Sequence, residues 1–221
     1  SGITAQALVG DSLYFGHIAI PKPDLHVIYQ ALLIGGVAGV LGGAFARLLA
    51  QPGLTRLPGH WMQRALLCGI GCAAIGFLTQ GATAGSGYEV TKAMIDGQAT
   101  GAEPSVFFPV LKLGTTLLSY LSGMAGGIFS PSLSIGAGVG FSIAKLAAFG
   151  NAPACALIGM VAFFSGAVQA PLTAVIIVTE MTDQHILIIP FLAAAFMGQA
   201  IGRRFLPVPL YRYLATRHVE A

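Results

Sequence analysis

Long apolar segments, separated by short connections rich in glycine, proline or charge, make up most of the chain. They lie at residues 28–49, 61–79, 104–121, 132–149, 151–169, 171–181 and 186–202, and a short amphipathic stretch follows at 208–217. Several of them approach or reach the ~20 apolar residues with which a helix crosses a bilayer. Only 9% of the residues are charged and 55% are hydrophobic, whereas a soluble domain carries roughly 25% charged residues. The pattern therefore predicts an all-α polytopic membrane protein.

Glycines are arranged along one face of the first apolar segment. Gly35, Gly39 and Gly43 follow one another at a spacing of four residues, and the chain has 30 glycines in all. A helix with this spacing presents a stripe of bare backbone, against which another helix can pack closely. We therefore expect a bundle in which some helix backbones nearly touch.

Arginines gather on connections that fall on one side of the predicted membrane. Arg47, Arg56 and Arg64 lie between the first two segments, and Arg203, Arg204, Arg212 and Arg217 follow the last long one. The alternate connections carry Asp24, Asp96, Glu103, Glu180 and Asp183. Because basic residues favour the cytoplasmic side, we expect a multi-pass protein of the cell (inner) membrane with a cytoplasmic C-terminus. The net charge of +3 indicates no nucleic-acid partner.

The beginning of the chain differs from the rest. Residues 1–27, around the sequence IPKPD, are expected to form the end of a preceding helix and an exposed connection. The chain begins with Ser-Gly-Ile rather than Met, which is typical of a fragment, a split protein or a processed product. The sequence leaves these three possibilities open.

One lysine lies inside an apolar segment. Lys112 belongs to the segment 104–121, and a charge at membrane depth usually faces protein or water. It is either an electrostatic aid to an anion path or a lysine that is paired internally or reaches toward the membrane surface.

The remaining candidate ligands are expected to have structural roles rather than to bind a metal or take part in catalysis. Cys68 and Cys72 share a helix face but have no further ligands at a metal-binding spacing, so we expect them to pack as small apolar groups. Glu180, Asp183 and His185 follow an apolar segment and are expected to form a solvated turn. We predict no metal, no cofactor and no catalytic residue.

The segment GGIFSP, at 126–131, is the strongest candidate for a binding site. Ser130 is a favourable N-cap and Pro131 suits the first helical position, and Gly126 and Gly127 loosen the backbone before them. The free N–H groups of a helix start attract anions, and transporters place such broken helices at membrane depth. A helix start without a ligand is the alternative.

Three motifs carry a resemblance to a known family. They are LSGMAGGIFSPSLSIGAGVG, GAVQAPLTAVIIVTEMTD and VPLYRYL. Their order and spacing resemble the CLC chloride channels and chloride/proton antiporters, whose GxFxP signature corresponds to GIFSP here. The resemblance covers nearly the whole chain. It implies that residues 28–221 form the C-terminal half of the CLC membrane domain, one half of an inverted-repeat fold with broken and tilted helices.

The family likeness implies a chloride site with specific donors. Its backbone donors would be Ile128 and Phe129, in the loop and helix start formed with Gly126, Gly127, Ser130 and Pro131. Tyr211, at the start of the last helix, would donate its hydroxyl to the same ion. Physical chemistry agrees, because an anion in an apolar pocket needs N–H and O–H donors, and neutral donors allow it to leave again.

Two motifs of the family are missing from this sequence. The GSGIP serine and the GREGP glutamate belong to the first half of the family fold, and neither motif is present. GSGYE, at 85–89, is similar to the first of them but lies at the inverted-repeat counterpart, so Ser86 is not assigned to the ion. Channel and antiporter therefore cannot be distinguished, and a CLC-like carrier of fluoride or another anion is the alternative function.

The resemblance also implies partners. We expect the N-terminal half of the same CLC protein, the lipid bilayer, and a second copy that packs through residues 171–202. The sequence supplies a run of large aliphatic residues there, namely Ile186, Leu187, Ile188, Ile189 and Leu192, although such a run can also face lipid. An intramembrane enzyme is a remote alternative, because the chain contains neither HExxH nor GxSxG. We predict that the protein is not an enzyme.

Overall fold

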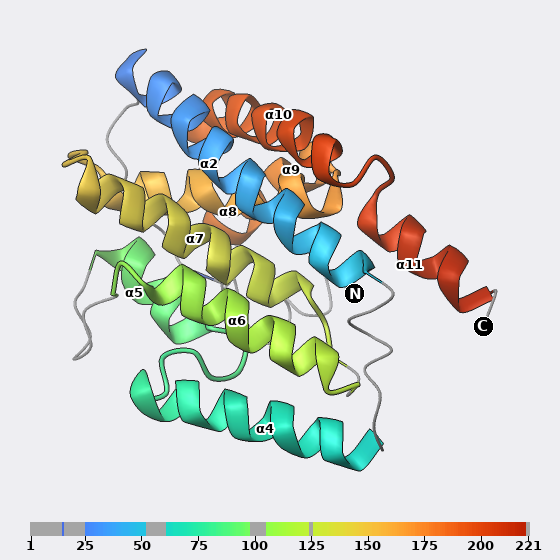
Figure 1. Ribbon diagram of the computed structural model, residues 1–221. Helices are drawn as coiled ribbons and strands as arrows, with labels where there is room; N and C mark the ends of the chain where they lie inside the picture. The colour runs from blue at the N-terminus through green and yellow to red at the C-terminus, as the bar shows by residue number, and fades with distance from the viewer. Residues whose placement is uncertain (1–14, 16–24, 52–60, 98–104, 124–125, 220–221) are drawn as a thin grey trace, which may run out of the picture.

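The computed structural model describes residues 15, 25–51, 61–97, 105–123 and 126–219, and these residues form helices and connections without a strand. The helices are α2 (Leu25–Ala50), α4 (Trp61–Leu78), α5 (Tyr88–Asp96), α6 (Phe108–Leu121), α7 (Phe129–Leu146), α8 (Ala152–Val168), α9 (Pro171–Thr182), the 3-10 turn η1 (His185–Leu187), α10 (Ile188–Phe205) and α11 (Leu210–Val219). Each apolar segment of the sequence corresponds to one helix (Figure 1), so the predicted all-α architecture is confirmed. The predicted helix end and connection at 1–27 lie almost entirely outside the described residues.

Helix α8 is the centre of the fold. All of its residues from Ala154 to Val168 are buried, and it packs against α2, α7, α9 and α10. Such a helix, apolar all round, has to be covered on every side. Asn151 caps its start, because the side-chain oxygen accepts a hydrogen bond from the backbone N–H of Ala154 at 3.1 Å.

Glycines bring α2, α8 and α10 into backbone contact. A Cβ atom on Gly39 of α2 would lie 2.8 Å from the Cα atom of Gly198 of α10, and one on Gly43 would lie 2.9 Å from the Cα atom of Gly202. One on Gly166 of α8 would lie 3.0 Å from the Cα atom of Gly39. The close packing predicted from the glycine stripe is therefore confirmed.

The opposite side of the molecule is less closely packed. Helix α4 lies at the edge of the bundle (Figure 1) and packs against α6. It exposes Leu67, Phe77 and Leu78 to the extent of 70%, 87% and 80%. By length and composition, His26–Ala50 and His185–Thr216 are the two described stretches long and apolar enough to cross a membrane.

The aliphatic run at 186–192 does not present a single face. Ile186 and Ile189 are exposed, whereas Leu187 is fully buried. Because Leu187 lies in the turn η1 before α10, its side chain points into the core. Leu187 therefore does not face a second copy or lipid, contrary to the expectation for this run.

Candidate functional site

The GGIFSP segment does form a helix start, but the helix begins earlier than predicted. Ile128 is the N-cap of α7, and no side chain caps it. Ser130 and Pro131 are the second and third helical residues, so the prediction of Ser130 as N-cap and Pro131 as first helical residue is wrong. The physical reason is that Ile128 already has nearly helical dihedrals, φ −92° and ψ −8°. Proline is accommodated because N–H groups in the first turn have no partner inside the helix.

Three backbone donors are therefore available at this helix start. The N–H groups of Ile128, Phe129 and Ser130 have no acceptor within the helix. The carbonyl of Ile128, by contrast, accepts from the backbone N–H of Ser132 at 3.1 Å and from its hydroxyl at 2.6 Å. Ile128 is only 8% exposed, so these donors lie at the boundary of the protein interior. The positive end of the helix dipole adds to their attraction for an anion.

Residues of this helix start line two cavities. The larger, of about 520 Å³, is bounded by α4, the turn at 81–85, α6 and the residues Gly126, Gly127, Ile128 and Pro131. The smaller, of about 190 Å³, is lined on the other side by Phe129, Ser130 and Ser134. Consecutive residues of one helical turn thus face different cavities.

Gly126 and Gly127 are exposed, and a Cβ atom added to either would have nothing within 4 Å. They differ in this respect from the glycines of α2, α8 and α10. Neither residue is required for packing among the described residues.

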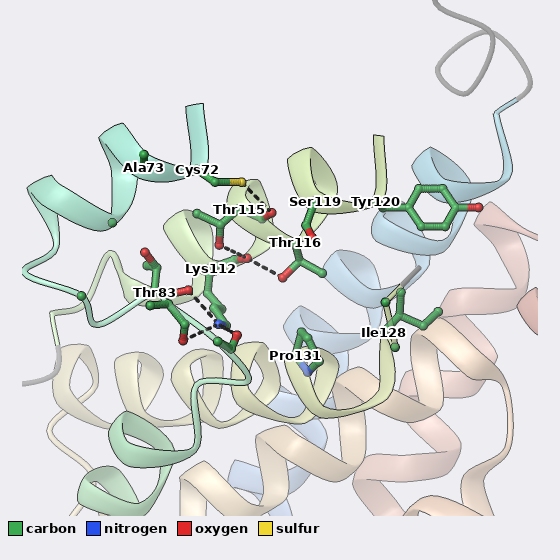
Figure 2. Close-up of a pocket in the computed structure, with 16 residues that line it drawn as sticks. Cys72, Ala73, Thr83, Lys112, Thr115, Thr116, Ser119, Tyr120, Ile128 and Pro131 are labelled. Atoms are coloured by element: carbon green, nitrogen blue, oxygen red, sulfur yellow. Dashed lines mark hydrogen bonds between the residues drawn. The ribbon is translucent and has the colours of Figure 1, made fainter. Parts of the chain in front are cut away.

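Lys112 is paired internally in the wall of the larger cavity. Its side chain is 1% exposed, and Nζ donates to the carbonyls of Thr83 at 2.8 Å, Gly85 at 2.7 Å and Ala84 at 3.4 Å (Figure 2). Three carbonyl acceptors use the three protons of the ammonium group. The interpretation as an internally paired lysine is therefore confirmed.

Helix α6 contributes a row of hydroxyl groups that sequence reasoning missed. Thr116, Ser119 and Tyr120 line the larger cavity together with Lys112 (Figure 2). The hydroxyls of Thr115 and Thr116 donate to the carbonyl of Lys112, at 3.0 and 2.7 Å. The signal was present in the sequence, because a spacing of three to four residues from Lys112 places polar residues on the same face of a helix.

Tyr211 is not brought to this site by the described chain. It lies in the first turn of α11, is 47% exposed, and is not among the residues that line either cavity. Helix α11 packs against α2 and α8. The structure therefore unites Ile128, Phe129, Ser130 and Pro131 at one place and leaves Tyr211 at another.

The other candidate ligands have structural surroundings. Cys68 and Cys72 are free thiols, and Sγ of Cys72 lies 3.6 Å from the carbonyl of Thr115. Ser86 lines the smaller cavity. In the part of the chain that the structure describes, no three His, Cys, Asp or Glu side chains lie close enough to share a metal ion.

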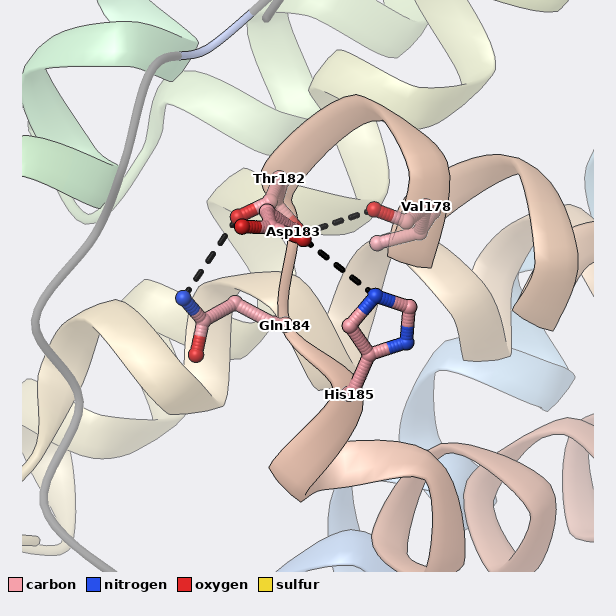
Figure 3. A network of polar contacts seen from close by, with 5 residues as sticks. All are labelled: Val178, Thr182, Asp183, Gln184 and His185. Atoms are coloured by element: carbon pink, nitrogen blue, oxygen red, sulfur yellow. Dashed lines mark hydrogen bonds and ion pairs between the residues drawn. The ribbon is translucent and has the colours of Figure 1, made fainter.

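The polar turn after α9 is exposed, as expected from the sequence. Asp183 ends α9 in a left-handed conformation and forms an ion pair with His185 at 3.2 Å (Figure 3). Their side chains are 44% and 64% exposed. Such a pair contributes little to stability, and its exposure indicates a solvated turn rather than a buried proton site.

Comparison with known families shows to which family the chain belongs. The family model described as "Voltage gated chloride channel" matches residues 1–203. The chain belongs to the CLC family. The resemblance stated from the three motifs is thereby confirmed.

Two solved CLC structures are similar to this chain. The crystal structure of a CLC-type fluoride/proton antiporter superposes with a TM-score of 0.77 at 21% identity, over 91% of this chain and 51% of that protein. The structure of a slow cyanobacterial Cl⁻/H⁺ antiporter superposes with a TM-score of 0.74 at 22% identity, over 96% and 52%. The fold is therefore that of a CLC membrane protein, and the chain spans about half the length of these two proteins.

Proposed function

We propose that this chain is the second half of a CLC anion transporter, in which the start of α7 holds chloride at the constriction of the anion path. The observation that carries the proposal is a helix start with free N–H groups whose residues Ile128 and Phe129 line two cavities. Backbone donors at a helix start attract an anion without a full counter-charge. They therefore allow it to leave again.

Tyr211 supplies a hydroxyl donor to the same ion in this proposal. The support for it is the family likeness of the VPLYRYL motif. The side chain is half-exposed on α11, so it has room to turn toward an ion. A neutral hydroxyl adds a donor that a desolvated anion needs.

Lys112 supports the anion path without binding the ion. Its ammonium group holds the carbonyls of Thr83, Ala84 and Gly85, which otherwise would point their negative ends into the cavity. None of the described residues that line that cavity carries a carboxylate. Lys112 is the one charged side chain among the described residues of that lining, and its buried, internally paired ammonium gives the cavity a field that favours anions over cations.

The proposal includes partners and location. The N-terminal half of the same protein would complete the anion path, and a second copy would pack on 171–202. The protein would lie in the cell (inner) membrane with its C-terminus in the cytoplasm, in accordance with the distribution of arginines. It would carry out transport and no enzymatic reaction.

Isothermal titration of the full-length protein with chloride tests the proposed site. Replacing the Phe129 amide by an ester removes one N–H and leaves the side chain in place. Because a hydrogen bond to a charged group contributes about 1.5–3 kcal/mol, chloride affinity should fall roughly ten- to hundredfold. Ile128→Val keeps its N–H and should bind nearly as tightly as the parent.

The opposite ranking would contradict the proposal. An ester variant that binds chloride like the parent, together with a weakened Ile128→Val, would mean that side chains recognise the ion. Titration with fluoride under the same conditions tests the second candidate function. Fluoride binding at the same donors with chloride excluded would identify a fluoride carrier.

A further inference from the structure

The break between α8 and α9 is formed by a residue in an unfavourable conformation. Gln169 has φ 64° and ψ 34°, in the left-handed region. Glycine adopts this conformation without strain, whereas it is uncommon for a residue with a long side chain. Gln169 is also buried, with 7% of its surface exposed. A strained residue inside a protein has to be held by its surroundings, and such outliers point to functional positions.

The side chain of Gln169 makes a contact that glycine could not make. Its amide nitrogen Nε2 donates to the carbonyl of Leu206. Leu206 is the C-cap of α10 and has extended dihedrals, φ −137° and ψ 106°. The backbone carbonyl of Gln169 in turn accepts from Nε2 of Gln199, on α10, at 3.0 Å. Gln169 thus binds both α10 and the connection that follows it.

The contact lies directly before α11. Leu206 and Leu210 are buried at the two ends of the Pro-Val-Pro connection, with exposures of 8% and 0%, and Tyr211 comes next in the chain. Two prolines limit the conformations of that connection. Fixing the carbonyl of Leu206 therefore fixes the point from which α11 starts.

We propose that Gln169 is the positioning residue that fixes the start of α11, and with it the place of Tyr211, relative to the bundle. The part that concerns Tyr211 as an anion ligand rests on the proposed function. The strain of a left-handed glutamine is retained because its amide is the link between the broken helix α8–α9 and the last helix. A hydrogen bond in such an apolar environment is stronger than one in water.

Gln169→Gly in the full-length protein separates this role from a general structural one. Glycine relieves the backbone strain at this position but removes a buried side chain and the donor of the Leu206 carbonyl, so the bundle should still fold but unfold at a moderately lower temperature. Backbone amides at 213–216, the first in α11 to donate within the helix, should exchange with deuterium roughly two- to tenfold faster, because one neutral hydrogen bond is lost. Chloride affinity, measured by titration calorimetry, should fall, at most by the factor seen in Tyr211→Phe. Combining the two changes should cause no further loss.

Two control variants sharpen the test. Gln169→Asn keeps an amide and tolerates the left-handed conformation, but its side chain is one methylene too short for the carbonyl of Leu206. It should behave like Gln169→Gly. Gln184→Ala removes another buried glutamine, at the other end of α9, whose amide donates to the carbonyl of Thr182 at 3.4 Å. It should leave exchange at 213–216 unchanged.

Other results of these measurements would overturn the positioning role of Gln169, its link to Tyr211, or the proposed anion contact of Tyr211. Unchanged exchange at 213–216 in both Gln169 variants would overturn the proposal, and so would equally faster exchange throughout α2 and α8. A further loss of chloride affinity in the double variant would overturn the link to Tyr211. If Tyr211→Phe alone leaves chloride affinity intact while the Gln169 variants still loosen α11, the positioning role stands. The proposed anion contact of Tyr211 then fails on its own.

Discussion

Glycine serves opposite purposes on the two sides of this molecule. Between α2, α8 and α10 it lets helix backbones touch, as at Gly39 and Gly198. On the side of α4 and the start of α7, Gly126 and Gly127 have open space around them, and the neighbouring cavity measures about 520 Å³. The packed side holds the fold together without polar contacts across its glycines. The open side leaves backbone donors accessible, and this is where an anion can be bound.

The largest expected effect comes from filling the packed side. A Cβ atom on Gly159 of α8 would collide with the backbone of Gly136 and Gly140 of α7. Backbone cannot move aside as a side chain can, so Gly159→Leu should exceed the usual overpacking cost of about 1–3 kcal/mol. We expect no monodisperse protein by fluorescence-detected size-exclusion chromatography. Gly69→Leu on α4, where nothing lies within 4 Å of the added atom, is the control and should elute like the parent. If the two variants elute alike, the packed side and the side of α4 do not differ in their tolerance of a larger side chain.

The 221-residue chain should be unable to transport chloride by itself. The family motifs GSGIP and GREGP are absent from the 221 residues, and the chain spans about half the length of the two similar CLC structures. Liposomes containing the 221-residue chain alone should show chloride efflux at the background rate, whereas the full-length protein should empty them. Robust, selective efflux from the chain alone would mean that two copies can enclose a path.

On the open side, Lys112 stabilises the turn that contains Thr83, Ala84 and Gly85. In Lys112→Met, the carbonyls of Thr83 and Gly85 lose their donor, and each buried unsatisfied acceptor costs about 1–3 kcal/mol. The free energy of unfolding should fall by roughly that amount, because water in the adjoining cavity can replace part of the lost contacts. Lys145→Met is the control, since Lys145 is exposed and its ammonium lies 5.1 Å from the centre of the Phe141 ring. Thermal unfolding followed in detergent measures both. Equal loss in the two variants would show that the carbonyl contacts of Lys112 do not stabilise the turn.

Sequence reasoning anticipated the packed side better than the open one. The helices and the glycine stripe follow from local periodicity, so Gly35, Gly39 and Gly43 could be assigned to a close contact before their partner was known. The family motifs located the start of α7. Its N-cap was assigned wrongly because Ser130 is locally favourable, while the dihedrals of Ile128 depend on the whole connection.

Contacts between distant segments could not be foreseen from local rules. The carbonyls that hold Lys112 come from residues 27–29 positions earlier in the chain. The partner of the Gln169 amide lies 37 positions later. A single sequence shows that a buried lysine needs acceptors, but it does not show which backbone supplies them.

The smallest expected effect lies on the outer face of the packed side. Ile189 is 68% exposed, so Ile189→Trp should leave folding intact and affect only what covers α10. If a second copy packs there, the larger ring should lower the dimer fraction of the full-length protein in detergent, by light scattering coupled to chromatography. Leu187, which is fully buried, cannot contribute to that face directly, and Leu187→Ala is therefore expected to reduce stability rather than dimerisation. A dimer fraction unchanged by Ile189→Trp would mean that this part of the packed side faces lipid. The packed side would then differ from the side of α4 only in how closely its helices pack.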